Sequence, residues 1–246
     1  MRNKIVKFAF VALLGVGLMS CAKLEARDDL QKGATAFKAG KYEAAVSFFQ
    51  EASRLDPDLT VAEVFLGTSY EQQYIPGAQS EDNMKFANMA IKTFEDILTK
   101  DPKNVSAVAG LAGIYYNMGD IRKAREYYVK HSQLDPTNPT PFYEIGTADW
   151  IIVFDKNNPP PEDEQRTLVD EGLKSVDQAI VLNPDYDDAM AYKNLLLREK
   201  ARLTDNEDEK KQLIAQADDM FTKVLEARKR IAAKKASLAG TADNKQ

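Results

Sequence analysis

The sequence predicts an all-α fold, an α-solenoid in which antiparallel helix pairs stack in a row, and three observations support this prediction. A short sequence motif that ends in proline recurs along the chain. Its prolines lie 45, 34 and 48 residues apart, at Pro57, Pro102, Pro136 and Pro184. Small and large apolar residues recur at a fixed register before each proline. The segment Glu207–Lys235 carries an apolar stripe at helical spacing. Each repeat would be one helix pair whose apolar face the next pair covers.

The residues that recur at this spacing are typical of one repeat family. They are Gly33, Gly40, Tyr42, Ala45, Phe49 and Ala52 in the first unit, Gly67, Tyr70, Ala90 and Phe94 in the second, Leu111, Tyr115, Gly119, Ala124 and Tyr128 in the third, and Ile145, Gly146 and Ala179 in the fourth. The pattern resembles the tetratricopeptide repeat (TPR), a pair of antiparallel helices with a period of 34 residues. Small residues such as Ala124 let two helices approach closely, and large ones such as Tyr128 fill the space beside them.

The register places about four to five repeats along the chain. Their predicted bounds are 26–59, 60–104, 105–138, 139–186 and, for a degenerate repeat with a capping helix, 187–235. The second and fourth repeats carry insertions near Gln73–Ser80 and Asp155–Glu162, between the two helices of each pair. The Asn- and Pro-rich second insertion predicts a loop, whereas the first fits a loop or lengthened helices equally well. The fourth repeat also has Gly172 where the family has Ala.

The C-terminal segment predicts a long last helix over Glu207–Lys235, with Leu213, Ala217, Phe221, Val224 and Ile231 on its buried side. Its outer face is charged, as the end of a solenoid requires. We expect residues 236–246 to be frayed or disordered. The basic cluster Arg228–Arg230 fits either a contact with anionic lipid or cell wall, or complementation of the helix dipole, and we favour the dipole.

The first twenty residues have the organisation of an export signal. Arg2, Lys4 and Lys7 precede the apolar run Phe8–Gly17. This run has about ten residues, whereas a helix that spans a bilayer needs roughly twenty. The segment 1–20 is therefore predicted to be a cleaved signal peptide rather than a membrane span.

The sequence Leu18-Met19-Ser20-Cys21 resembles a lipobox, the cleavage motif of bacterial lipoproteins. Cys21 is the sole cysteine of the chain. The resemblance implies that Cys21 becomes the lipid-bearing first residue, with 21–25 as a short tether. The alternative is an ordinary signal peptide with a coincidental cysteine. In lipoproteins of bacteria with two membranes, an Asp directly after the cysteine retains the protein at the inner membrane. Ala22 stands at this position, which favours the outer membrane facing the periplasm if the cell has two membranes.

The composition argues against several functional classes. The net charge is −5, or about −8 without the three basic residues of the first twenty, which disfavours nucleic-acid binding. The one histidine, His131, falls at a position that packs against the next repeat, so we expect a structural role. The sequence has no His-Glu-x-x-His motif, no cysteine pair and no phosphate loop. We therefore predict neither enzymatic activity nor a cofactor or metal site.

The TPR resemblance implies that the first helix of each repeat lines a concave groove, which would hold an extended peptide or a partner's helix. The residues that the register assigns to this groove include Phe37, Lys38, Glu71, Tyr116, Asn117, Tyr143, Thr147, Trp150 and Arg198. Aromatic residues and Arg dominate the energetics of many interfaces. Phe37, Tyr116 and Trp150 could instead be partly core residues.

These observations predict a membrane-anchored TPR scaffold lipoprotein that mediates protein–protein interactions in cell-envelope assembly. A substrate-binding protein of the envelope, for a peptide, glycan or small molecule, is the alternative. A third class is an enzyme-like accessory protein of the cell wall.

Overall fold

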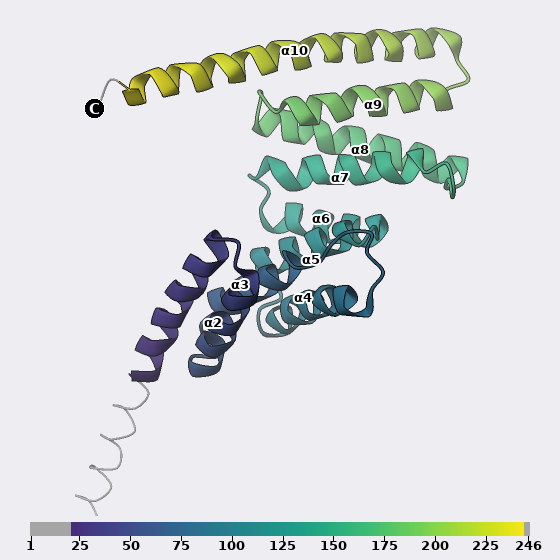
Figure 1. Cartoon of the computed structure of the whole chain (residues 1–246). Helices are drawn as coiled ribbons and strands as arrows, with labels where there is room; N and C mark the ends of the chain where they lie inside the picture. Colours follow the sequence, from purple (N-terminus) through teal and green to yellow (C-terminus); the bar gives the residue numbers. More distant parts are fainter. Residues whose placement is uncertain (1–20, 244–246) are drawn as a thin grey trace, which may run out of the picture. The chain divides into compact units, whose positions relative to one another are not determined.

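The structure, a computed structural model, describes residues 21–243, and every regular element in that part of the chain is a helix. A first helix is described over residues 21–38. It is followed by α2 (Tyr42–Leu55), α3 (Thr60–Glu71), α4 (Glu81–Lys100), α5 (Val105–Asn117), α6 (Ile121–Leu134), α7 (Pro139–Phe154), α8 (Glu162–Leu182), α9 (Asp187–Leu203) and α10 (Glu207–Asp243) (Figure 1). The predicted all-α fold of antiparallel helix pairs is confirmed.

The helices form two compact units, one ending at Gly119 and one beginning at Asp120. In unit 1, α3 packs against α2 and α4, and α5 packs against α4 and α3. In unit 2, α7 packs against α6, α8 and α9, and α9 packs against α8 and α10. The first helix of one pair therefore contacts the first helix of the next, as α3 contacts α5 and α7 contacts α9. We call these surfaces the first-helix layers of unit 1 and unit 2.

Two of the turns within the pairs use a glycine, and several helices begin at a short polar side chain. Gly40 and Gly119 have φ angles of 71° and 81°, which a residue without Cβ adopts cheaply. Asn104 caps α5 by accepting a hydrogen bond from the Ala107 backbone N–H at 3.0 Å. Asp120 caps α6 in the same way. Such caps satisfy N–H groups that have no partner within the helix.

The first insertion is both a loop and a lengthened helix. The chain leaves α3 at Glu71, turns through residues 72–80, and then forms the 20-residue α4. Asn83 closes the loop because its side chain accepts from the Ile75 N–H at 2.7 Å and donates to the carbonyls of Ile75 and Ala78. The second insertion is a loop over residues 155–161, as predicted, followed by the 21-residue α8.

The two chain ends differ from the expectation. Residues 21–25, expected to be a tether, belong to the helix described over 21–38. The last helix continues to Asp243 rather than ending at Lys235, so most of the segment expected to be disordered is helical. Alanine, the best helix former, accounts for much of that segment. The predicted signal peptide, 1–20, lies outside the described residues.

The basic cluster of α10 lies 13 residues before the end of the helix and pairs with acidic side chains, so the favoured dipole role is wrong. Arg228 and Arg230 form ion pairs with Asp187 and Asp185, at 2.9 and 2.7 Å, and so tie α10 to the start of α9.

Between residues 21 and 243, none of the helices has an apolar stretch long enough to cross a membrane.

Candidate interaction surface

The first-helix layer of unit 1 contains a half-buried carboxyl group with an amide partner. The Asn117 side chain, from α5, donates a hydrogen bond to Glu71 Oε1, from α3, at 3.2 Å. A Cβ added to Gly113 would lie 2.8 Å from the same oxygen, so the glycine makes room for the carboxylate. Burial raises the pKa of Glu71 to about 7. This surface therefore carries a carboxyl group with a pKa near neutral pH, and none of the ion pairs among residues 21–243 gives it a cation as partner.

The other predicted groove residues of unit 1 are in different environments. Tyr116 is 40% exposed on α5, which fits a residue available to a partner. Lys38 is exposed. Phe37 is half-buried and packs edge-to-face against Tyr42 and Phe65, with ring centroids 5.3 and 6.0 Å apart. These contacts favour a packing role for Phe37.

The first-helix layer of unit 2 is built around an aromatic cluster. Tyr143 packs against Tyr186 and Tyr192, at 5.0 and 5.6 Å between ring centroids. Trp150 stacks on Phe154 at 4.8 Å and meets Tyr192 edge-on at 5.7 Å. Trp150 is also half-buried and packs against the apolar core of unit 2, which favours a packing role for most of the ring.

Two groove residues of unit 2 differ in whether they have polar partners. Arg198 donates to Asp218 on α10 at 2.7 Å and to Asn194 at 3.2 Å, so it links α9 to α10. The Asn194 side chain in turn donates to the Ala217 carbonyl. Thr147, on α7, has a buried hydroxyl without a hydrogen-bond partner.

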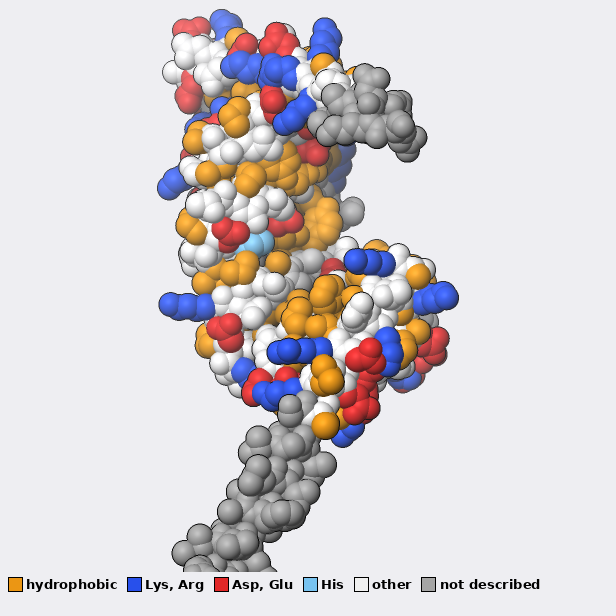
Figure 2. All heavy atoms as spheres, turned by 90° about the vertical axis from the view of Figure 1, so that its left-hand side faces the viewer, with side chains coloured by type: hydrophobic (Ala, Val, Ile, Leu, Met, Phe, Trp, Pro, Cys, Tyr) orange, Lys and Arg blue, Asp and Glu red, His pale blue; other side chains and the backbone are white. Residues whose placement is uncertain are grey.

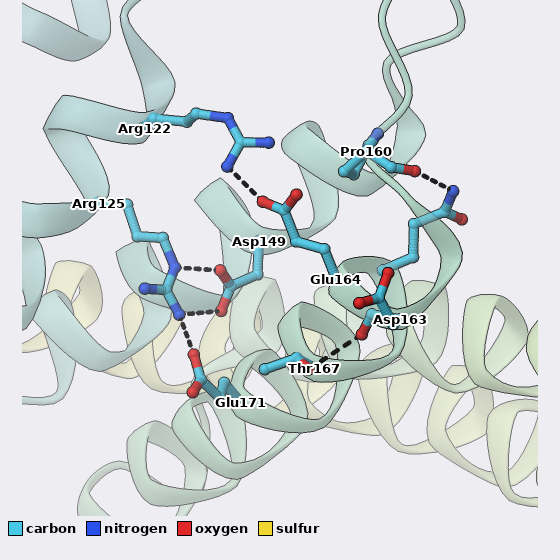
Figure 3. Close-up of polar contacts among 9 residues, drawn as sticks. Arg122, Arg125, Asp149, Pro160, Asp163, Glu164, Thr167 and Glu171 are labelled. Carbon is cyan, nitrogen blue, oxygen red and sulfur yellow. Dashed lines mark hydrogen bonds and ion pairs between the residues drawn. The ribbon is translucent and has the colours of Figure 1, made fainter.

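A buried ion-pair cluster on three successive helices of unit 2 is absent from the sequence prediction (Figure 3). Arg125 from α6 pairs with Asp149 from α7, which is fully buried, and with Glu171 from α8 at 2.5 Å. Burial raises the pKa of Asp149 to about 6, and the hydrogen bond from Arg125 opposes that rise. The nearby pair of Arg122 and Glu164, at 2.5 Å, is more exposed.

The sequence does contain a signal for this cluster. Asp149 stands at the repeat position that Tyr70 and Tyr115 occupy in the two preceding repeats. The same cluster explains Gly172, because an added Cβ there would lie 3.1 Å from the Asp149 Cβ and 3.2 Å from a Leu196 methyl group. The family's Ala is therefore replaced where the buried acid needs the space.

No group of three His, Cys, Asp or Glu side chains among residues 21–243 is arranged to hold a metal ion. His131 is buried, and its burial lowers the pKa of the imidazole. The Nδ1 atom of His131 has no hydrogen-bond partner.

Family models recognise two parts of this repeat array. A model described as tetratricopeptide repeat matches residues 87–140, and another with the same description matches residues 30–59. The chain contains tetratricopeptide repeats. Proteins built of TPRs bind protein or peptide partners. A comparison with curated proteins finds no match.

Solved TPR structures share the fold at low sequence identity. MamA 41-end from Desulfovibrio magneticus RS-1 is 14% identical, with a TM-score of 0.59 over 84% of this chain and 96% of that one. The MamA RS-1 ArsTM double mutant is 15% identical, with a TM-score of 0.61 over 85% and 97%. YrrB, described as a TPR protein with an unusual peptide-binding site, is 16% identical, with a TM-score of 0.54 over 82% and 90%. At these identities the likeness shows the TPR fold alone.

Proposed function

We propose that this chain is a lipid-anchored TPR scaffold that binds a protein partner on its first-helix layers and acts in the assembly of a bacterial cell envelope. The proposal that the chain binds a protein partner depends on Tyr116. This aromatic side chain is 40% exposed on the first-helix layer of unit 1. It lies next in sequence to Asn117, which holds the Glu71 carboxylate. An exposed ring beside polar groups is the composition expected of an interface anchor.

The polar groups of unit 1 suit an extended peptide. The backbone of a peptide offers N–H donors, and the Glu71 carboxylate has accepting capacity beyond the one hydrogen bond from Asn117. Tyr116 would contact an apolar side chain of the same segment. In unit 2, Tyr143 and Trp150 are largely used in packing, so their exposed edges would add contact area rather than an anchor.

The membrane part of the proposal rests on the sequence Leu18–Cys21 and on the exposed position of Cys21. Because residues 21–25 are helical, lipid on Cys21 would hold the first repeat close to the bilayer without a flexible linker. The outer membrane, on its periplasmic side, is the location we propose.

The lipid anchor is tested by labelling with radioactive palmitate in the bacterium that makes the protein. We expect label in the wild-type chain and none in Cys21→Ala, with the wild type in the membrane fraction and the variant released from it. Ser237→Ala, an exposed change at the far end of the chain, serves as the control for expression and handling. Equal labelling of the wild type and Cys21→Ala would rule out this anchor.

A further inference from the structure

The last helix carries an apolar stripe that the described side chains of unit 2 cover only in part. Ile214, Phe221 and Leu225 on α10 are 39%, 57% and 45% exposed, so the prediction that Phe221 lies on the buried side of this helix is wrong. With Ala232, which is also exposed, they follow one another at spacings of seven, four and seven residues. At 3.6 residues per turn these spacings return to within about 20° of one direction, so the four residues form a straight line along the helix.

This stripe is distinct from the side of α10 that packs on α9. The buried side consists of Leu213, Ala217, Met220, Val224 and Ala227, which pack against the core residues of α9. The buried side lies about 100° around the helix from the exposed stripe. The exposed apolar residues are therefore a second apolar face rather than the edge of the first.

The length of α10 also calls for a partner. The helix has 37 residues, whereas α9, which supports it, has 17, and α10 extends beyond the end of α9 (Figure 1). Among the described side chains, the last hydrogen bond from α10 to another part of the chain is that of Arg230 to Asp185, which lies in the turn before α9. A helical segment of about a dozen residues without tertiary contacts is only marginally stable in water.

The charges of α10 are segregated along its length. Residues 207–219 hold five acidic and two basic side chains, a net charge of −3, and residues 223–235 hold six basic and one acidic side chain, a net charge of +5. Figure 2, which is turned by 90° from Figure 1, shows blue and red side chains together at the top of the view, where α10 lies. Two parallel copies of this helix would place like charges side by side. An antiparallel pair would place the acidic half of each copy opposite the basic half of the other, which favours that orientation and its register.

We propose that α10 is a self-association surface on which a second copy of this chain docks, with the two α10 helices antiparallel and the twofold axis at Lys223. In this register Phe221 packs against Leu225 of the second copy, and Ile214 packs against Ala232 of the second copy. Lys223 itself points about 180° away from the stripe, so the two lysines at the axis do not meet. The contact uses no side chain of the first-helix layer of unit 1, so it is independent of the proposed binding at Tyr116, whereas Asp218, on its flank, accepts a hydrogen bond from Arg198 in the layer of unit 2.

Register-specific crosslinking tests the orientation. Two full-length chains are made, one with Asp218→Cys and one with Lys229→Cys, both carrying Cys21→Ser so that the introduced thiol is the only one. Both positions are exposed and lie on the same flank of the stripe, about 40–60° from it. In the antiparallel register residue 218 of one copy lies beside residue 229 of the other. A short bis-maleimide should therefore crosslink the mixture of the two chains, and neither chain alone.

The strength of the contact is tested by two matched substitutions, each of which replaces an exposed apolar residue with an acidic one. Phe221→Glu should weaken self-association about thirtyfold, the loss typical of an interface anchor, and should abolish the crosslink in the mixture. Val181→Glu, which changes a 73% exposed apolar residue on α8, should leave both unchanged. Circular dichroism checks that both variants fold, and light scattering gives the protein mass.

Each possible result decides the proposal. A twofold protein mass with crosslinks in the mixture alone supports it. A monomeric mass without crosslinks would overturn it, as would self-crosslinking of Asp218→Cys, which indicates a parallel pair. A monomer that binds anionic phosphatidylglycerol vesicles through α10 would assign the stripe to a lipid surface instead. None of these results bears on palmitate labelling or on binding at Tyr116.

Discussion

The two units fill equivalent repeat positions with different chemistry. In unit 1, aromatic rings lie directly over glycines: a Cβ on Gly33 would lie 2.6 Å from the Phe49 ring, and one on Gly110 would lie 2.3 Å from the Phe94 ring. In unit 2, Val176 takes the place of the ring, and a buried carboxylate, Asp149, takes the place of a tyrosine. The helix-pair fold thus tolerates either a ring on a glycine or an ion pair, provided that the volume is filled and the buried charge is paired.

The buried carboxyl groups of the two units also differ in their partners. Asp149 has Arg125, whereas Glu71 has only the amide of Asn117. Removing Arg125 would leave the charge of Asp149 buried without a partner, whereas removing the charge of Glu71 would relieve a cost of the same kind. We therefore expect charge removal to act in opposite directions at the two sites.

The largest expected effect is the loss of the cation in unit 2. Arg125→Met should destabilise the protein by about 3–5 kcal/mol at pH 8, because Asp149 would be left buried without a partner. Because Arg125 lowers the pKa of Asp149, its loss would raise that pKa above about 6, so the cost should shrink as the pH falls from 8 to 6 and Asp149 becomes protonated. Chemical denaturation at the two pH values measures both effects.

The control for this change is on the same helix. Arg122→Met removes the more exposed pair with Glu164 and should cost about 0–1 kcal/mol. Equal losses for the Arg125 and Arg122 variants would mean that the burial of Asp149 does not govern the stability of unit 2.

The next largest effect concerns the rings over glycines. Gly110→Ala should destabilise unit 1 by about 1–3 kcal/mol, since the new methyl group would overlap the Phe94 ring, which is fully buried and cannot move away freely. Gly172→Ala in unit 2 should cost less, because its nearest contact would be 3.1 Å. Thermal melting of the two variants gives the ranking, and the reverse order would refute the comparison.

A smaller change of opposite sign is expected at Glu71. Its pKa of about 7 is raised above the ordinary 4.5, so its contribution to stability is present below about pH 4.5 and is lost as the pH rises through 7. Glu71→Gln should remove this loss and stabilise the protein by about 1–2 kcal/mol at pH 8, with little effect at pH 4. Glu95→Gln, an exposed change on α4, should be neutral at both pH values. Destabilisation by Glu71→Gln at pH 8 would mean that the carboxylate is stabilised by its surroundings.

The sequence predicted the repeats because their packing is local and periodic: Phe49, Phe94 and the turn glycines recur at a register that the fold requires. It placed Glu71 and Asn117 in the groove set for the same reason, but the bond between them joins two repeats and follows from no pattern within either. The sequence analysis missed Asp149 because a single acidic residue in an apolar helix is normally expected on the surface. Its burial depends on Arg125, which lies 24 residues earlier in the sequence and contacts it only in the folded structure. The length of α10 was not predicted because it depends on helix propensity and on contacts with partners. Neither of these follows from the periodic pattern of the repeats.

The most direct test of the central claim, that the first-helix layer of unit 1 binds a protein partner, is photocrosslinking in intact cells. The photoreactive residue benzoylphenylalanine replaces Tyr116 in one strain and Met89 in another. Met89 is a 45% exposed residue on α4, the second helix of its pair. We predict that light produces a covalent adduct with another protein from position 116 and none from position 89. Adducts from position 89 alone, or equally from both positions, would contradict the assignment of the binding surface.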